Sequence, residues 1–436
     1  MFRKPFKTHL LAATAVAAMA APVPAFAAGY GLKEQSVSGQ GTSFAGITAG
    51  GNGDISAMFF NPAALGMVKN IEAVQTITGI IPRSEVKSAS ATRVTGTPIA
   101  GNASPGDIAQ DAIVPAGYLA YAISPDLKVG LSMNGPWGLV TDYGYDWIGR
   151  YHGVRSDLRT YNFTPTVSYR VHPTLTVAGG VQIQYAKAKL SSVIDAGLSV
   201  SPALGGRLDT TADLIGDAWG WGATAGLMYE PMKGTRIGLA YRSAVKHDLE
   251  GNARFNGPPA TAATFRNQAI KAKLVTPDSA NLGVYHEVTD RWAVMGDIQW
   301  TNWSRFYELN VDFATLPNSI TDERWKDTWF LSLGTAYQVS DALTLRGGVA
   351  FDKGAVGISH RTPRIPEGDR YWLSIGAGYK VNEWLQLDAA YTHIFAPDAE
   401  VALRDTGAGH DRGRGNLNVK YENSVDIIGV QARITF

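Results

Sequence analysis

Beyond about residue 70 the chain alternates between apolar and polar positions with a period of two. From Leu175 to Tyr185 one parity is mainly apolar or aromatic, and the other parity carries Gln182 and Gln184. The same alternation recurs over residues 292–300, 385–392 and 428–436. This period predicts β-strands with one apolar and one polar face, although a soluble β-sandwich would show it as well.

Three further features favour strands that cross a membrane. The strands are often about ten residues or longer, as a tilted strand in a bilayer requires. Aromatic residues such as Trp292 and Trp300 lie near strand ends, where interfacial girdles form. The chain ends on Phe436 at the close of an alternating strand, a common feature of bacterial outer-membrane barrels. We therefore predict an all-β transmembrane barrel, and we expect the barrel assembly machinery to recognise the strand that ends at Phe436.

Turn-forming residues divide the periodic runs, and their spacing predicts the number of strands. Longer loops, rich in polar residues or in Gly and Pro, lie at 84–111, 191–215, 251–265 and 405–416. Short turns on one side and long loops on the other are typical of outer-membrane barrels. Six short turns imply seven hairpins and about fourteen antiparallel strands. These turns lie at residues 124–126, 172–174, 231–234, 289–291, 340–341 and 382–383.

The first residues have the pattern of a secretory signal peptide. A basic segment precedes an apolar run over residues 10–21, and Ala25-Phe26-Ala27 fits a cleavage site. The alternative, a transmembrane helix, is disfavoured because the run is short for a span of about 20 residues. We predict a signal peptide over residues 1–27 and the outer membrane of a Gram-negative bacterium as the location.

Composition excludes several classes of function. The 436 residues carry a net charge of +1, eight His and no Cys. The small net charge argues against a nucleic-acid partner, which requires a basic surplus. Without Cys the chain has no disulfide framework and no thiolate nucleophile, and its His residues lack metal-ligand spacing. We predict no catalytic residues, no metal and no cofactor.

Residues 28–70 precede the first clear strand, which begins at Ile71, and they show no sustained alternation. A barrel of this size has a water-filled lumen unless something fills it. We predict that residues 28–70 fold as a hatch inside the barrel of residues 71–436. The alternative is a disordered periplasmic tail, which is disfavoured by the many apolar residues: Phe44, Ile47, Ile55, Met58, Phe59, Phe60 and Leu65.

Asn61-Pro62-Ala63 follows Phe59 and Phe60 within this segment. An Asn-Pro pair marks a turn or the start of a helix. Two interpretations stay open: a rigid turn that pins the hatch in the lumen, or a plain helix cap.

The third strand is interrupted at Gly135-Pro136-Trp137-Gly138, although its alternation should run from Leu127 to about Tyr143. Pro136 removes a ladder donor, and a closed barrel has no edge strand that would tolerate the loss, so we expect a bulge or kink. Unpaired backbone groups facing lipid are costly, so the kink should open a gap lined by protein or water. An apolar molecule could leave sideways through this gap. The alternative is an ordinary bulge that redirects Trp137.

Two cations near strand starts are candidates for binding a ligand carboxylate. Lys326 lies among aromatic residues, and Arg370 follows Asp369 and precedes two aromatic residues. Alternatively, both are solvated or paired, as charged groups at strand ends usually are. Trp137 is the third candidate ligand contact.

With these features the chain resembles the FadL/TodX family of outer-membrane transporters for long-chain fatty acids and hydrocarbons. The resemblance runs from Ala28 to Phe436, and Asn61-Pro62-Ala63 matches the hatch signature of the family. Four further blocks are weak singly and specific together. They are Ala28-Gly29-Tyr30 with Ser36, Ser38, Gly39 and Gly41; Trp219-Gly220-Trp221-Gly222 with residues 225–230; Tyr241-Arg242-Ser243 with Val245-Lys246; and Ile365-Pro366 with residues 369–374.

The resemblance implies a barrel with an N-terminal hatch, ligand capture by extracellular loops, a lumen pocket and a lateral exit at a kinked third strand. Gly138 falls at the kink glycine of the family, and Lys326 falls where the family has a lysine near the pocket. Pro136 departs from the family pattern and should strengthen the kink. Fatty-acid transporters tend to have a further arginine where this chain has Ser191, and a hydroxyl residue where it has Gly135. These two departures favour a neutral hydrocarbon over a fatty acid.

We predict passive transport of hydrophobic small molecules, either long-chain fatty acids or hydrocarbons, by a monomer in contact with outer-membrane lipid. The main alternative is a general diffusion porin for small polar solutes, which a plugged lumen disfavours. A barrel enzyme or an adhesin is a further alternative that only the long loops support.

Overall fold

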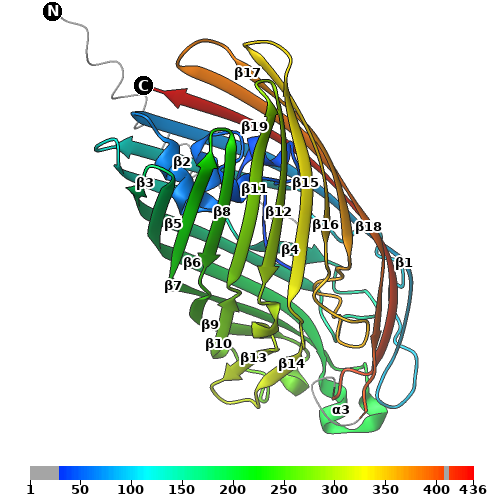
Figure 1. Ribbon diagram of the computed structural model, residues 1–436. Coiled ribbons are helices and arrows are strands. Elements are labelled where there is room, and N and C mark those ends of the chain that lie inside the picture. The colour runs from blue at the N-terminus through cyan, green and yellow to red at the C-terminus, as the bar shows by residue number, and fades with distance from the viewer. Residues whose placement is uncertain (1–28, 407–411) are drawn as a thin grey trace, which may run out of the picture.

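The computed structural model describes residues 29–406 and 412–436, so the predicted signal peptide lies outside the described residues. Nineteen strand segments form one sheet, which is closed because β1 pairs with both β2 and β19. Five strands are each divided into two segments, which gives a closed barrel of fourteen antiparallel strands. Figure 1 shows this barrel and confirms the predicted all-β class.

Nine strands of the barrel are continuous, and five are divided. The continuous strands are β1 (Ile71–Thr92), β2 (Ala112–Ala122), β5 (Arg155–His172), β6 (Leu175–Asp195), β7 (Asp209–Met232), β16 (Leu343–Asp352), β17 (Arg370–Lys380), β18 (Leu385–Leu403) and β19 (Asn416–Thr435). The divided strands are β3 (Leu127–Asn134) with β4 (Gly138–Asp142), β8 (Thr235–Arg242) with β9 (Val245–Asn256), β10 (Gln268–Thr276) with β11 (Ser279–Thr289), β12 (Trp292–Thr301) with β13 (Glu308–Phe313), and β14 (Ser319–Asp322) with β15 (Thr328–Gln338).

The six predicted short turns join strands at the end of the barrel where the C-terminus lies (Figure 1). Three of the predicted long loops are shorter than expected, because the strands continue further. β1 runs to Thr92 rather than ending near Ser84, β6 runs to Asp195, and β9 runs to Asn256. Beyond the membrane the outward positions of β1 become charged, so the apolar alternation stops while the pairing with β19 continues. The apolar periodicity in the sequence therefore predicted the length of the lipid-facing part of these strands, not their whole length.

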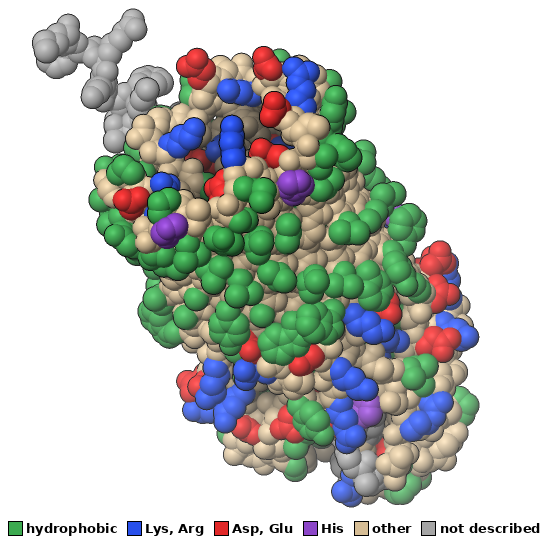
Figure 2. Space-filling model, viewed as in Figure 1, with side chains coloured by type: hydrophobic (Ala, Val, Ile, Leu, Met, Phe, Trp, Pro, Cys, Tyr) green, Lys and Arg blue, Asp and Glu red, His purple; other side chains and the backbone are tan. Residues whose placement is uncertain are grey.

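Apolar side chains face outward and polar side chains face the lumen. On β6, Val177 and Val181 are exposed, whereas Gln182 and Gln184 are buried. Figure 2 shows the resulting apolar belt, with charged side chains gathered towards both ends of the molecule. Tyr371 and Tyr379, both exposed, lie eight residues apart on β17. At about 3.3 Å per residue and a tilt of about 40°, this spacing covers about 20 Å along the membrane normal, close to the apolar band of such barrels.

The hatch, defined here as residues 29–70, folds into four short helices. They are α2 (Val37–Gln40), η1 (Ile47–Ala49), η2 (Ile55–Phe59) and η3 (Pro62–Met67). Figure 1 places them inside the barrel, nearer the end with the short turns. The other helices of the described residues lie in loops: α3 (Ala196–Val200), η4 (Pro202–Leu204), η5 (Pro259–Thr261) and η6 (Trp303–Arg305). Among the described residues no helix combines the length and the hydropathy needed to cross a membrane.

The hatch backbone lies directly against the barrel wall because the wall carries glycine at the points of contact. On β16, a Cβ added to Gly348 would lie 2.1 Å from the carbonyl oxygen of Thr42. On β8, a Cβ added to Gly238 would lie 1.9 Å from the carbonyl oxygen of Thr48. No side chain fits at such distances. Five more wall glycines have a hatch atom at most 2.9 Å from an added Cβ: Gly226, Gly283, Gly334, Gly376 and Gly429.

We predict that Gly348→Ala displaces the hatch and opens the lumen to ions. The added methyl group would overpack the contact with Thr42, at a cost of about 1–3 kcal/mol. Ion conductance of the purified protein in planar bilayers should rise above that of the wild type. The control is the neighbouring Gly347→Ala, whose added Cβ would lie no nearer than 3.9 Å to Ser374. Equal conductance of the two variants would contradict the close contact.

Candidate functional site

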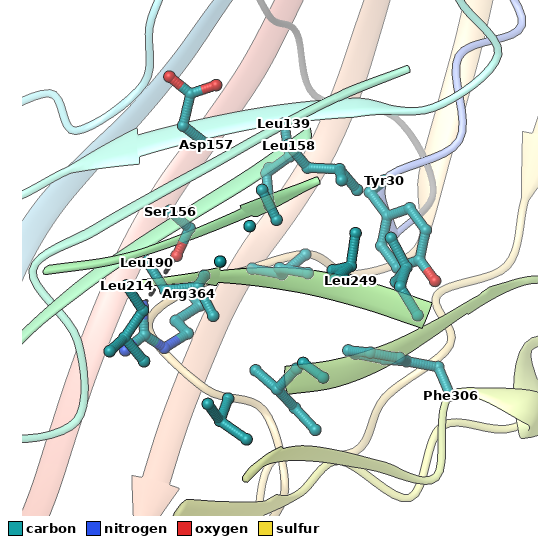
Figure 3. Close-up of a pocket in the computed structure, with 18 of the residues that line it drawn as sticks. Tyr30, Leu139, Ser156, Asp157, Leu158, Leu190, Leu214, Leu249, Phe306 and Arg364 are labelled. Atoms are coloured by element: carbon teal, nitrogen blue, oxygen red, sulfur yellow. Dashed lines mark hydrogen bonds between the residues drawn. The ribbon is translucent and has the colours of Figure 1, made fainter. Parts of the chain in front are cut away.

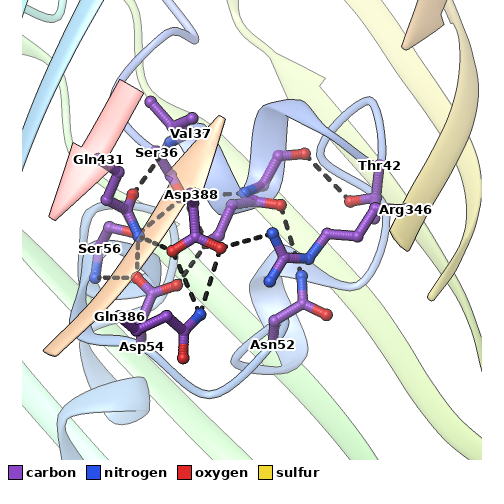
Figure 4. A network of polar contacts seen from close by, with 12 residues as sticks. Ser36, Val37, Thr42, Asn52, Asp54, Ser56, Arg346, Gln386, Asp388 and Gln431 are labelled. Atoms are coloured by element: carbon purple, nitrogen blue, oxygen red, sulfur yellow. Dashed lines mark hydrogen bonds and ion pairs between the residues drawn. The ribbon is translucent and has the colours of Figure 1, made fainter. Parts of the chain in front are cut away.

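A buried ion pair on the barrel wall anchors the hatch. Arg346 on β16 and Asp388 on β18 lie 2.6 Å apart, and both side chains are almost fully buried. Gln431 on β19 donates to Asp388 at 3.4 Å and accepts from the backbone N–H of Val37 at 3.2 Å. Figure 4 shows this network between the strands and the hatch. The first turn of α2 is thus tied to charged groups of the wall, where loss of one partner would leave an uncompensated buried charge.

Asn61 both caps a helix and pins the hatch to the wall. Its side-chain oxygen accepts from the backbone N–H of Ala63 at 2.9 Å, and Pro62 follows as the first residue of η3. Its side-chain nitrogen donates to the carbonyl oxygens of Thr48, at 2.7 Å, and of Leu227 on β7, at 3.0 Å. The two interpretations that the sequence left open therefore describe one residue with two roles.

Phe59 and Phe60 hold the middle of the hatch. Arg242 on β8 donates to the carbonyl oxygen of Phe59 at 2.5 Å, and its guanidinium lies 4.2 Å from the centre of the Phe59 ring. Phe60 is buried and packs against Phe44, with the ring centres 5.4 Å apart. These contacts position the hatch and leave its N-terminal residues, 29–35, to reach further into the lumen.

The wall has an interruption between the second and third strands. The ladder between β2 and β3 stops at the pair Gly117–Met133. Pairing resumes at an isolated bridge between Ala109 and Thr141. In between, β4 pairs with β5 and, within the described residues, not with β2. We call this interruption the window; it contains residues 110–116 on one side and residues 134–140 on the other.

The N-terminal part of the hatch covers the window from inside. Leu32 donates its backbone N–H to the carbonyl oxygen of Pro136 at 2.8 Å. Gly138 donates its N–H to the carbonyl oxygen of Tyr30 at 2.8 Å. The carbonyl oxygen of Trp137 accepts from the backbone N–H of Thr160 on β5 at 3.1 Å. Backbone groups that the third strand cannot pair in the sheet thus find partners in the hatch and on β5, as a low-dielectric surrounding requires.

A cavity of about 300 Å³ lies at the window. Its lining includes Leu32 of the hatch, Gly135, Trp137 and Gly138 of the third strand, and Asn162 of β5. All four residues that the sequence singled out at the interruption therefore lie at this wall gap, and three of them line its cavity.

Trp137, which lines this cavity, belongs to a cluster of aromatic side chains around Tyr30. Its ring centre lies 5.8 Å from that of Tyr30 and 5.6 Å from that of Trp303, both in edge-on geometry. Tyr30 also contacts Phe306, at 5.5 Å, and Trp325, at 5.8 Å. Tyr30 is the centre of the cluster, because each of the other four rings lies against it.

A second cavity lies on the far side of Tyr30, in the extracellular half of the lumen. Its free volume is about 90 Å³. Figure 3 shows apolar side chains converging on it, while Asp157 points away. Most of the lining is apolar: Tyr30, Leu139, Leu158, Leu190, Leu214, Leu249, Ile270, Leu274, Phe306, Leu309, Val311 and Ile365. We call this cavity the upper pocket.

Arg364 supplies a cation to the upper pocket. It lies in the loop between β16 and β17 and donates to the carbonyl oxygen of Arg155 at 3.1 Å and to the Ser156 hydroxyl at 3.2 Å. Burial lowers its pKa to about 10. Within the described residues Arg364 forms no ion pair; the Glu323 carboxylate, which lines the same pocket and accepts from the Trp325 indole at 3.2 Å, attracts it from a greater distance. A buried guanidinium without a carboxylate in direct contact is suited to binding an anionic group.

The two cations predicted as ligand contacts lie elsewhere. Lys326 is exposed, because the alternation around it turns Trp325 inward and the lysine outward. Arg370 is buried, but it forms an ion pair with Asp352 at 3.0 Å and is thus held in the wall. Neither residue lines the upper pocket or the window cavity. The prediction that they contact a ligand is not supported by these positions.

Two residues that position the site were missed in the sequence. Pro115 lies on β2 in the window and, like Pro136 opposite it, has no N–H for a ladder. Arg364 stands between two prolines in Thr362-Pro363-Arg364-Ile365-Pro366, a pattern that predicts a rigid loop presenting its central side chain. Among the residues that the structure describes, no group of His, Cys, Asp or Glu is placed to hold a metal ion.

Comparisons with known proteins identify the family that has this architecture. Residues 17–436 match the family model described as outer membrane protein transport protein (OMPP1/FadL/TodX). The long-chain fatty acid transport protein of Salmonella typhi is 30% identical, over 89% of this chain and 92% of the relative. A Pseudomonas aeruginosa FadL homologue of known structure has a TM-score of 0.86 and 25% identity, covering 94% of this chain and all of that chain.

The toluene transporter TodX of Pseudomonas putida shares the fold, with a TM-score of 0.68 and 19% identity, covering 94% of this chain and all of that chain. The predicted outer-membrane location and the resemblance to the FadL/TodX group are thereby confirmed. The family consists of transport proteins rather than enzymes. The chain belongs to the OMPP1/FadL/TodX family of outer-membrane transport proteins.

Proposed function

We propose that the protein carries hydrophobic small molecules into the outer membrane by passive diffusion through a lateral exit. The extracellular loops capture the ligand, the upper pocket holds it, and the window releases it sideways into the bilayer. The observation that carries this proposal is the window, where the wall ladder stops and a cavity takes its place. No energy source takes part, because the ligand moves from water to an apolar phase.

Apolar contacts support a continuous route from the loops to the upper pocket. Trp147 and Tyr151, in the loop between β4 and β5, are buried in the same apolar cluster as Leu249 and Leu274 of the pocket wall. Val356, in the loop between β16 and β17, belongs to it as well. Small movements of these loops would expose an apolar surface that is already joined to the pocket.

Arg364 leads us to propose a long-chain carboxylate as the ligand. The sequence departures at Gly135 and Ser191 favour a neutral hydrocarbon, but they take no account of this loop arginine. Its position in an apolar pocket without an ion pair suits an amphipathic anion. The name of the Salmonella typhi relative, a long-chain fatty acid transport protein, supports the same ligand class.

A general porin would need an open lumen, and the hatch contacts oppose that alternative. Asn61, Arg242 and the wall glycines hold the hatch at several points around the wall. We further propose that the protein acts as a monomer surrounded by outer-membrane lipid. The strand that ends at Phe436 would be the signal for the barrel assembly machinery.

We predict that closing the window abolishes most transport. Pro136→Thr with Gly138→Val restores a ladder donor and places a side chain where an added Cβ already lies 3.0 Å from Leu32. Uptake of radiolabelled oleate by cells that lack their own transporter should fall, while heat-modifiable migration of the protein shows a folded barrel.

The matched control for the window variant makes the same two substitutions elsewhere. Pro165→Thr lies on β5 and Gly179→Val lies on β6. A Cβ added to Gly179 would lie 3.6 Å from its nearest neighbour. This control should transport as the wild type does. Undiminished uptake by the window variant would contradict the lateral route.

We predict that Arg364→Leu selectively weakens carboxylate binding. Loss of a charge-assisted hydrogen bond of about 1.5–3 kcal/mol should lower the affinity for oleate at least about tenfold. Affinity for hexadecane, which has no head group, should stay the same, and Arg364→Lys should retain part of the oleate affinity. Isothermal titration with purified protein measures all three, and an equal loss for both ligands would contradict a head-group role.

A polar latch joins the N-terminal segment to both sides of the window. The Tyr118 hydroxyl on β2 donates to the carbonyl oxygen of Gln35 at 2.7 Å and accepts from Asn134 on β3 at 2.8 Å. Gln35 in turn donates to the carbonyl oxygen of Gly135 at 3.0 Å. The segment that covers the window is thus fixed by hydrogen bonds that a small displacement would break.

We predict that Tyr118→Phe loosens this segment without unfolding the barrel. Removing the hydroxyl leaves buried partners unsatisfied, at a cost of about 1–3 kcal/mol. Hydrogen exchange at the amides of Leu32 and Gly138 should become faster. Tyr121→Phe, at an outward-facing tyrosine of the same strand, is the control and should leave both amides protected. The same protection in both variants would contradict the latch.

A further inference from the structure

The window cavity continues from the lumen onto the outer surface of the barrel. Leu32 and Asn162 line it from inside, whereas Tyr161, Tyr185 and Trp219 line it from positions that face lipid. Trp219 is 58% exposed. The cavity therefore passes through the wall and ends against outward-facing side chains.

These outward-facing residues form one row across three adjacent strands. Tyr161 on β5 is directly opposite Tyr185 on β6, which is directly opposite Trp219 on β7. The ring centres lie 6.3 Å and 5.3 Å apart along the row. Its first member adjoins the window, because the preceding residue, Thr160, accepts from the backbone N–H of Trp137 at 2.9 Å.

A row of charged residues lies next to the aromatic row, on its extracellular side. Arg159 is directly opposite Lys187, which is directly opposite Asp217. Arg159 is bound to Asp157 at 2.9 Å, whereas Lys187 is exposed and, within the described residues, forms no ion pair. Asp157 pairs with Arg159, whereas Asp217, although directly opposite Lys187, forms no ion pair with it within the described residues. Lys187 is thus an exposed cation without an ion-pair contact, beside an aromatic surface at the level of the outer-leaflet head groups.

We propose that Tyr161, Tyr185, Trp219 and Lys187 form a second ligand-binding site, the exit strip, on the lipid-facing surface. An amphipathic carboxylate that has passed the window rests its chain on the three rings and its head group against Lys187 before it enters the outer leaflet. This site rests on the proposed transport function. Trp221, two residues further along β7 and 65% exposed, does not line the cavity and so marks an ordinary interfacial aromatic.

The first test compares two double variants in cells. Tyr185→Ala with Trp219→Ala removes rings of the strip, and Trp221→Ala with Trp329→Ala removes two outward tryptophans that do not line the cavity. We expect the strip variant to lower the initial rate of oleate uptake about tenfold, through lost aromatic contacts. Its equilibrium binding of oleate in detergent should match the wild type, because the upper pocket is intact. The control should match the wild type in both measurements, and equal uptake by the two double variants would overturn the strip.

The second test asks whether the head-group site serves the departing ligand or a resident lipid. Lys187→Gln should slow uptake of oleate and leave uptake of hexadecane unchanged. A phosphate-bearing outer-leaflet lipid that copurifies with the wild type and is lost from Lys187→Gln, with oleate uptake unchanged, would overturn the assignment.

The window variant separates failure of the strip from failure of the transport route. Undiminished oleate uptake by Pro136→Thr with Gly138→Val would overturn the lateral route and the strip together. Reduced uptake by the window variant, with normal uptake by the strip variant, would overturn the strip alone.

Discussion

Every feature of this molecule depends on the need to pair backbone hydrogen-bonding groups inside a membrane. An unpaired N–H or C=O in hydrocarbon costs several kcal/mol, so strands cross only as a closed barrel. The sheet closes where β1 pairs with β19. At the window the ladder fails, and Leu32 and Tyr30 provide the missing partners for Pro136 and Gly138. An opening in the wall is tolerated because the hatch completes it from inside.

The hatch is fixed by two different kinds of contact. Glycines such as Gly348 let its backbone touch the wall, which excludes water and leaves no room for a side chain. Buried polar groups such as Asn61 and Arg242 add side-chain hydrogen bonds between the hatch and the wall, because Asn61 donates to Leu227 and Arg242 donates to Phe59. Dense packing with satisfied polar groups gives one position for the hatch rather than many. Because the rest of the hatch has one position, its N-terminal residues, 29–35, are held against the window.

The lumen is divided into apolar compartments rather than being one pore. The upper pocket has a mostly apolar lining, to which Arg364 adds a cation that forms no ion pair within the described residues. Tyr30, which lines this pocket, packs against Trp137, which lines the window cavity. In the route that we propose, a ligand passing these rings would stay in apolar contact, while water and ions would lose hydration without a replacement. Selectivity for amphipathic molecules would follow from this order of apolar cavities.

The sequence by itself determined the barrel, its fourteen strands, its outward apolar face and the break at Pro136, because periodicity and proline chemistry are local properties. Local pattern could not decide which cation meets the lumen. Lys326 and Arg370 look alike in sequence, yet one is exposed and the other is paired with Asp352. For the same reason the sequence did not identify Arg364 as a pocket residue. Nor did it predict the register that aligns Tyr161 with Tyr185 and Trp219. Only the tertiary structure decides such matters, since they depend on which distant strands and loops the closed barrel brings side by side.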